Sequence, residues 1–276
     1  MKKLRFGICI VLCIFLLCGC EQMFPFIPQS AVEPSVAPSQ APIITEPASD
    51  PATEPAVEPE PTEPEPTEPE HSDLYIPGVD VEDVITYFNE VCLDAEFVHG
   101  GDATVVQKWM EPIFYAVYGT PTEKDLEVLN EFTVWLNNYP GFPGIYEASN
   151  PDFANLRIYF CTQPELVDRM GSDYVGLDGA VTFWYMDNVI YDEVICVCND
   201  IDQYARNSVI LEEVYNGLGP VQDTMLRPDS LIYAEYVTPQ ALTEVDELIL
   251  KLLYHPDIKC GMNAEECAQV IRQLYY

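Results

Sequence analysis

The chain has 276 residues, of which 46 are acidic and 12 are lysine or arginine, so its formal net charge is −34. A surface this acidic repels nucleic acid and other polyanions, which excludes nucleic-acid binding as a function. The sequence also has no glycine-rich phosphate loop and no G-x-S-x-G turn, so it lacks the motifs of the common nucleotide-binding and serine-hydrolase folds.

Residues 1–19 have the pattern of an export signal: a basic start, then an apolar run too short for a membrane-spanning helix. The run ends in Leu-Cys-Gly-Cys at 17–20, which resembles the bacterial lipoprotein box, in which the last cysteine is lipidated. An ordinary secretory signal is the alternative. We expect the mature chain to begin at Cys20 and to be held by acyl chains on the extracytoplasmic face of a cell membrane.

Residues 20–73 predict a disordered tether. From Glu21 to Asp73 there are 13 of the chain's 24 prolines and 12 acidic residues, but no lysine or arginine. Proline removes backbone donors and like charges repel, so this segment cannot form a packed core. At about 3.1 Å per residue it would reach on the order of 150 Å, which suits a tether through a cell wall. A charge-dependent binding tail is the alternative.

Residues 74–276 are enough for one domain. Apolar spacing predicts a helix over 81–96, a strand over 106–118, and a second helix that starts at Thr122 with a capping box to Asp125. This second helix should turn four residues inward: Leu126, Leu129, Phe132 and Leu136. Further strands are predicted over 156–160, 180–185 and 189–197, the last two as a hairpin.

The most informative stretch, residues 211–223, reads L-E-E-V-Y-N-G-L-G-P-V-Q-D. Leu211, Val214, Tyr215 and Leu218 stand at the spacing of a buried helical stripe. Glu212 and Asn216 are four residues apart and share the neighbouring face. Gly219 can adopt the left-handed conformation that ends a helix. Two more helices follow, capped by Thr243 and by Asn263, and the whole order predicts an α+β fold with helices on a small twisted mixed sheet.

The frame of this stretch resembles the zinc-binding helix of the metzincin proteases, H-E-x-x-H-x-x-G-x-x-H. The resemblance places the catalytic glutamate at Glu213 and the helix-ending glycine at Gly219. The three histidine positions fall on Glu212, Asn216 and Gln222, so the scaffold is kept without its zinc ligands.

The downstream sequence extends the resemblance. Secreted metzincins continue with a Ser-Ile-Met turn and a helix that starts Leu-Thr-x-x-Asp and ends Leu-Tyr. Here residues 230–233 read Ser-Leu-Ile-Tyr, residues 242–246 read Leu-Thr-Glu-Val-Asp, and residues 253–254 read Leu-Tyr. Tyr233 stands in place of the methionine, and the resemblance implies a zincin-like fold.

Residues 80–276 are also similar to an uncharacterised family of secreted bacterial proteins known only as a domain of unknown function. In that family Glu-Glu replaces His-Glu, and a leucine-glycine turn with a nearby aspartate follows. Shared features here are Lys108-Trp109, Asn155 before its strand, and Tyr254 with Cys260-Gly261-Met262. This resemblance implies the same fold and supplies no known activity.

Zinc hydrolysis depends on neutral imidazoles, which this site lacks. Glu212, Asn216 and Gln222 would offer one carboxylate and two amide oxygens, a set better suited to Ca²⁺ or Mg²⁺. The histidines at 71, 99 and 255 lie in the tether or in predicted loops. We therefore expect no metal and no cofactor, with Asp223 as a replacement ligand only if a rearranged site exists.

Six cysteines lie in the domain, and export would permit disulfides. Cys260 and Cys267 are the candidates for a local bridge, with small buried hydrophobes as the alternative for most of the six.

Two functions remain. The first is a surface-anchored lipoprotein whose degenerate protease domain, a pseudoprotease, binds an extracellular peptide or protein without cleaving it. The alternative is a divergent metallohydrolase with a non-histidine metal site. A third interpretation makes Glu212 and Glu213 an ordinary solvated or hydrogen-bonded helix face.

Overall fold

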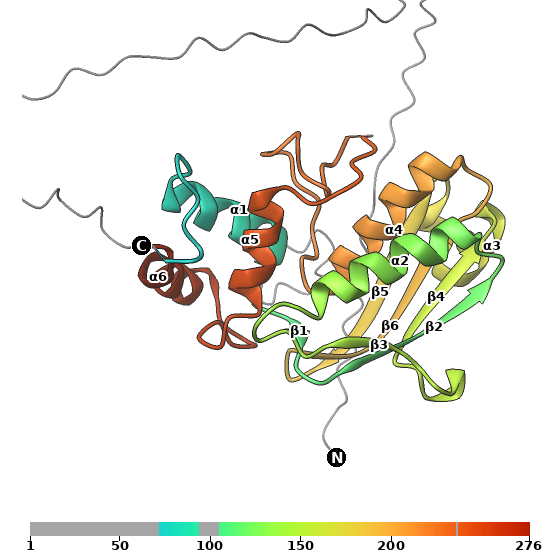
Figure 1. Cartoon of the computed structure of the whole chain (residues 1–276), viewed down its shortest axis with the longest axis horizontal. Coiled ribbons are helices and arrows are strands. Elements are labelled where there is room, and N and C mark those ends of the chain that lie inside the picture. The colour runs from blue at the N-terminus through green and yellow to red at the C-terminus, as the bar shows by residue number, and fades with distance from the viewer. Residues whose placement is uncertain (1–71, 94–104, 236) are drawn as a thin grey trace, which may run out of the picture. The chain divides into compact units, whose positions relative to one another are not determined.

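The computed structural model describes residues 72–93, 105–235 and 237–276 of the chain (Figure 1). The predicted signal peptide, the lipidated Cys20, the tether to residue 71 and His99 lie outside these residues, so those predictions stay untested. Within the described part, no helix is both long and apolar enough to cross a membrane.

The domain is built on a six-stranded, mostly parallel sheet. Its strands are β1 (Lys108–Trp109), β2 (Ile113–Gly119), β3 (Ile145–Glu147), β4 (Leu156–Cys161), β5 (Gly179–Met186) and β6 (Val189–Cys198). Strands β4, β2 and β3 follow one another on one side of β6, where β1 also pairs with the first two residues of β6. On its other side, β6 pairs with β5, which alone runs antiparallel.

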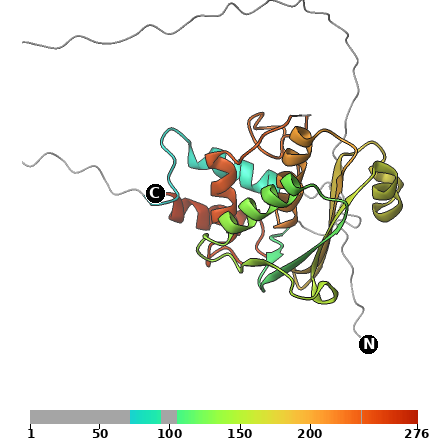
Figure 2. The same cartoon turned by 45° about the vertical axis from the view of Figure 1, so that its right-hand side comes forward.

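The six helices of the described part are α1 (Val81–Leu93), α2 (Glu123–Leu136), α3 (Gln163–Met170), α4 (Gln203–Gly217), α5 (Glu244–Leu253) and α6 (Ala264–Tyr275). Helices α2 and α4 lie across one face of the sheet, and α1, α5 and α6 gather beside it (Figure 1). Figure 2 shows α3 on the opposite face. The architecture is therefore mixed α/β, which agrees with the predicted α+β class.

Alternate side chains of the strands point into the main core. Val181, Ile195 and Ile158 pair across β5, β6 and β4, and each is at most 1 % exposed. The β5–β6 hairpin closes through Asp187 and Asn188, whose positive φ angles of 52° and 65° give the tight turn that a two-residue hairpin needs. The hairpin prediction is confirmed.

Several predicted elements are confirmed by their caps. Thr122, Thr243 and Asn263 each form a capping box at the start of α2, α5 and α6. The predicted strand over 106–118 is wrong in extent, because Met110–Pro112 separates β1 from β2. Leu126 is 43 % exposed and does not face the core, since the inward position beside it is taken by Asp125.

The predicted Cys260–Cys267 bridge is wrong in this structure, where all six described cysteines are free thiols. Cys267 points into the core from α6 and is fully buried, whereas Cys260 lies before the helix with its thiol near the Lys108 carbonyl, 3.9 Å away. The alternative prediction holds for the other cysteines, which are small buried groups: Cys92, Cys161, Cys196 and Cys198.

A buried carboxylate connects the loop after α4 to α5. Asp246 is fully buried and accepts hydrogen bonds from the Tyr87 hydroxyl at 2.9 Å and the Ser230 hydroxyl at 2.8 Å. It also accepts from the N–H groups of Leu231 and Thr243 at 3.1 and 3.0 Å. This one side chain therefore fixes the 230–233 turn against α1 and α5.

A buried ion pair joins α2 to α4. Arg206 Nε donates to Asp125 Oδ1 at 2.8 Å, with the two side chains 6 % and 0 % exposed. The other guanidinium nitrogens donate to the carbonyls of Asn199 and Ile201 and to Gln203. Because each charge is hydrogen-bonded, the pair fixes how the first turn of α4 packs on α2.

Two side chains from distant segments bind the last carbonyls of α4. Trp109 Nε1 donates to the Gly217 carbonyl at 3.1 Å, and the Tyr254 hydroxyl donates to the Leu218 carbonyl at 2.7 Å. Carbonyls at a helix end have no intrahelical partner, so these bonds stabilise the end of the helix at its buried position.

We expect Tyr254→Phe to lower the free energy of unfolding by about 1–3 kcal/mol, because the buried Leu218 carbonyl loses its donor. Urea unfolding followed by circular dichroism measures this. Tyr276→Phe is the matched control, since Tyr276 is 61 % exposed and should change stability little. Equal effects of the two variants would contradict this role of Tyr254.

Candidate functional site

The second half of α4 is enclosed by the domain. The predicted stripe of Leu211, Val214, Tyr215 and Leu218 is buried, with at most 7 % exposure. Glu213 and Asn216, on the other side of the helix, are also buried, at 3 % and 0 %. Glu213 is therefore not part of a solvated helix face, so the solvated form of the third interpretation is wrong for it, whereas Glu212 is half-buried.

Gly219 ends the helix region as predicted, with a φ of +123°. A Cβ added there would lie 2.6 Å from the Gln107 carbonyl oxygen, so glycine is required both for its conformation and for the close approach of the backbone.

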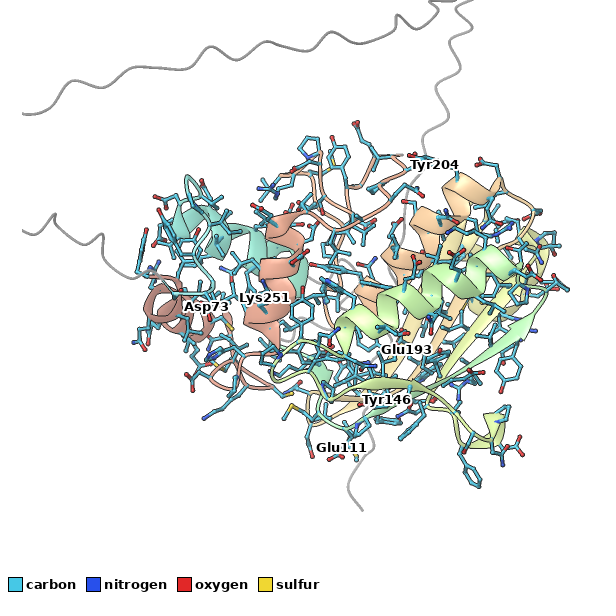
Figure 3. All side chains as sticks on the ribbon, in the orientation of Figure 1. Asp73, Glu111, Tyr146, Glu193, Tyr204 and Lys251 are labelled. Atoms are coloured by element: carbon cyan, nitrogen blue, oxygen red, sulfur yellow. The ribbon has the colours of Figure 1, made fainter. Side chains whose placement is uncertain are left out.

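Helix α4 packs on β5 and β6, and glycine occupies two positions at which a side chain from the other element comes very close to the backbone. A Cβ on Gly179, at the start of β5, would overlap the side chains of Glu213 and Val209. A Cβ on Gly217 would overlap the Glu193 carboxyl. Glu193 is 1 % exposed and lies on the face of the sheet that α2 and α4 cover (Figure 3). The glycines thus let two carboxyls lie directly between helix and sheet.

This buried acidic cluster, defined here as Glu193, Glu213, Asn216 and Asp223, carries polar atoms that the surrounding protein does not satisfy. In the described part of the chain, Glu193 Oε1, Glu213 Oε2 and both polar atoms of the Asn216 side chain have no hydrogen-bond partner. Buried polar groups are nearly always paired, and exceptions mark functional positions, water or bound groups. The cluster is therefore the candidate functional site.

Electrostatics connects the members of the cluster. Burial raises the pKa of Glu213 well above its ordinary value, and the charges of Glu212, Asp223 and Glu193 raise it further. Burial also raises the pKa of Glu193, although a hydrogen bond from Trp109 acts in the opposite direction. Both carboxyls therefore favour their neutral, protonated form in the folded domain.

The segment after α4 reaches the cluster and is held by a second segment. Thr224 forms an isolated bridge with Tyr233: its N–H donates to the Ile232 carbonyl at 2.8 Å, and its carbonyl accepts from the Ala234 N–H at 3.0 Å. Glu90 of α1 accepts hydrogen bonds from the Thr224 hydroxyl and the Met225 N–H. The turn at Tyr233 therefore lies beside the residues that directly follow Asp223.

Of the residues selected from the sequence, Glu212 and Asp223 lie close enough to Glu213 for their charges to raise its pKa, and Tyr233 lies near Asp223 through Thr224. Asn216 is buried on the same helix, and Gln222 is half-buried. His255 lies 30 % exposed beside Asp257. Over the residues described, no group of three or more histidine, cysteine, aspartate or glutamate side chains is arranged to hold a metal ion.

Sequence reasoning missed Glu193, although a signal was present. Glu193 is in phase with Ile195 and Val197 on β6, so period-two alternation places it on the core face. A carboxylate at a core position of a strand is rare unless it is paired or functional.

We expect Glu213→Gln to become more stable than the wild type as pH rises. A folded-state pKa above the unfolded value means that the folded state holds its proton longer, so stability is full below the unfolded pKa and is lost as pH rises through the folded pKa. Glutamine does not titrate, so the variant avoids this loss. Denaturant unfolding from about pH 5 to about pH 9 measures the difference.

The control for this series is Glu111→Gln, at an exposed residue between β1 and β2. Its substitution should change the free energy of unfolding by less than about 0.5 kcal/mol, as expected for an exposed side chain. A constant difference for Glu213→Gln would show that Glu213 does not titrate differently in the folded state.

Fold and site together define a mixed α/β domain with a mostly parallel sheet and a buried acidic cluster between α4 and strands β5 and β6. The chain belongs to the family described as Protein of unknown function (DUF2927), whose model matches residues 81–273. A comparison with curated proteins gave no match.

Proposed function

We propose that this domain is a degenerate, zincin-like protease domain that binds an extended peptide beside α4 and does not cleave it. The observation that carries the proposal is the position of Glu213, a member of the buried acidic cluster, against Gly179 of β5, the antiparallel strand at one end of the sheet. Two members of the cluster, Glu213 and Asn216, lie on the helix whose sequence resembles the metzincin frame.

The order of parts supports the zincin-like fold. A mostly parallel sheet ends in one antiparallel strand, and the helix with the Glu-Glu motif lies against that strand. A turn at 230–233 follows and is fixed beside the segment after the motif, and the next helix starts with the Leu-Thr-x-x-Asp pattern. These positions match the order of zinc helix, Met-turn and C-terminal helix that the resemblance implies.

The hydrogen-bond phase of β5 supports the binding mode. The Cys198 N–H donates to the Asp178 carbonyl, so alternation directs the backbone groups of residues 180, 182 and 184 toward β6. The N–H and C=O groups of Gly179, Val181 and Phe183 then point away from β6. Among the residues that the structure describes, no other strand pairs with β5. Val181 and Phe183 are 0 % exposed, so an extended peptide that adds there would first displace the groups that cover this edge, and it would then pass Glu213 beside Gly179.

The donor chemistry supports binding without hydrolysis. A catalytic zinc needs three ligands that hold it tightly and an open position for water. Carboxyl groups held in their neutral form and amide side chains are weak ligands for zinc, so on this proposal Glu213 has no metal-bound water to activate. We further propose that the chain is exported, lipidated on Cys20 and displayed on a tether, in line with the lipoprotein box and the proline-rich segment.

The peptide proposal is tested by selecting binders from a random-sequence peptide library with the full chain. Backbone N-methylation of a selected peptide should abolish binding at alternate positions only, because every second N–H pairs with a strand edge. Val181→Pro should weaken binding at least about tenfold, since it removes an N–H that points away from β6. Uniform tolerance of N-methylation would contradict strand addition.

Phe114→Ala is a matched control for that experiment, because Phe114 is 43 % exposed on β2, far from β5 in the sheet order. It should leave peptide affinity unchanged. Urea unfolding of Val181→Pro separates lost binding from lost folding.

A divergent metallohydrolase is the second candidate, and one observation favours it. A buried carboxyl whose pKa is raised well above its ordinary value suits a general acid or base, and Glu213 meets that description. This candidate expects chelator-sensitive cleavage of peptides from the same library, lost in Glu213→Gln. Binding without any cleavage would favour the first proposal.

A further inference from the structure

A groove separate from the acidic cluster opens between α2, α4 and α5. Its volume is about 400 Å³, which falls in the range of ligand-binding pockets. Its walls come from α2, from Asn207 and Leu211 of α4, from residues 240–242 and from Glu247 of α5. Asn207 and Leu211 lie one turn apart on the side of α4 that faces α2, not on the side that carries Glu213.

The floor of the groove is aromatic and apolar. The rings of Phe132 and Trp135 are stacked with centroids 5.6 Å apart, and Trp135 meets Tyr139 edge-on at 4.5 Å. Phe132 is almost fully buried, whereas Trp135 is only partly covered. A partly covered tryptophan ring offers a face for a flat or cationic group.

The rim of the groove is acidic. Glu131 is exposed on α2, and Glu247 stands opposite on α5, where it accepts from the Tyr139 hydroxyl at 3.4 Å. Lys124 is also at the rim: its ammonium group pairs with Glu127 at 3.0 Å, and the charge of Glu131 lies near enough to raise its pKa as well. The Lys251 ammonium group lies 3.9 Å from the Glu247 carboxylate and 5.8 Å from the centre of the Tyr139 ring. The domain's own lysine thus already shows a cation held between a carboxylate and an aromatic ring.

The net charge of the whole domain also favours a cationic partner. Residues 74–276 hold 34 acidic residues and 9 lysines or arginines, a net charge of −25. Within the described residues, six of these basic side chains are in ion pairs: Lys124, Arg157, Arg206, Arg227, Lys251 and Arg272. The field around the groove therefore attracts cationic segments and repels the chain's own acidic tether.

We infer that this groove binds a segment of a partner protein that presents an arginine next to an apolar residue. The guanidinium group stacks on Trp135 between the carboxylates of Glu131 and Glu247, and the apolar neighbour covers Phe132 and Leu211. Arginine fits better than lysine because its planar group stacks on a ring and donates to two carboxylates at once. Asn207 and Gln240, which bond to each other at 3.2 Å on the rim, can instead bond to the partner's backbone.

The test is a fluorescence titration of the full chain with the peptide acetyl-Leu-Arg-Phe-Arg-amide. The Trp184→Phe background leaves Trp135 and the fully buried Trp109 as the emitting residues. We expect a saturable change in emission. The same peptide with citrulline in place of both arginines keeps the shape, loses the charge, and should bind at least about tenfold more weakly.

Glu131→Gln should also weaken binding of the arginine peptide, and raised salt should weaken it further. Glu111→Gln is the control, because Glu111 is exposed and lies away from the groove (Figure 3). Equal affinity for the arginine and citrulline peptides would overturn the inference, as would binding that Glu131→Gln leaves unchanged. Neither outcome affects the proposed binding along β5, which involves other residues.

Discussion

Asp246→Ala is expected to lower the free energy of unfolding by roughly 3–5 kcal/mol, one of the largest losses available in this domain. The carboxylate is fully buried and accepts four hydrogen bonds, from Tyr87, Ser230, Leu231 and Thr243. Alanine would leave those donors unsatisfied in the core, and an unsatisfied buried donor costs about 1–3 kcal/mol. Urea unfolding of the full chain measures the loss.

The control for Asp246→Ala is Glu244→Ala, at an exposed position two residues earlier in the first turn of α5. It should cost well under about 1 kcal/mol, the scale of a helix-dipole effect. A comparable loss in both variants would show that helix initiation, not the buried network, is what Asp246 supplies.

Arg206→Met is the second large effect, with an expected loss of about 3–5 kcal/mol, because it leaves the buried Asp125 carboxylate without its cation. Burial opposes ionisation of Asp125, but hydrogen bonds from Arg206 and Thr122 outweigh it and lower its pKa. A lowered folded-state pKa gives stability that is present above the unfolded pKa and lost as pH falls through the folded pKa. The cost of the substitution should therefore shrink in acid.

The matched variant for that prediction is Arg206→Met with Asp125→Leu. Replacing both partners removes the uncompensated charge, so the double variant should recover part of the stability lost by Arg206→Met alone. Additive losses in the two single variants would mean that the two side chains do not act as a pair.

Much of the fold was predictable because local signals agree with tertiary packing. Three helices begin where the sequence predicts, because each has a polar N-cap residue followed three positions later by an acidic partner: Thr122, Thr243 and Asn263. The hairpin turn was predictable because Asp and Asn tolerate positive φ. In these places short-range chemistry alone determines the element.

The elements that sequence reasoning missed depend on distant partners. Strand β3 has three residues and exists because it pairs with β2. The short α3 has one fully buried residue, Leu166, so it shows no long apolar stripe. Leu126 was assigned to the core because its spacing fits, but the buried ion pair with Arg206 fixes the rotation of α2 through Asp125.

The candidate site was only half predictable for the same reason. Position in a motif selected Glu212, Glu213, Asn216, Gln222 and Asp223, and Glu213, Asn216 and Asp223 are buried. Glu193 reaches these residues from β6, Gly179 from β5 and Gly217 from the end of α4. These contacts join segments distant in sequence, so no local pattern predicts them. The separate groove at Trp135 likewise forms only when α2, α4 and α5 come together.

On the proposed function, α4 keeps the frame of a protease helix around a site that holds no catalytic metal. Elemental analysis of the purified full chain, after equilibration with zinc and removal of free metal, tests it most directly. The account predicts far less than one transition-metal ion per chain, and no change in that content in Glu213→Gln. One tightly held ion per chain, lost in Glu213→Gln, would contradict it.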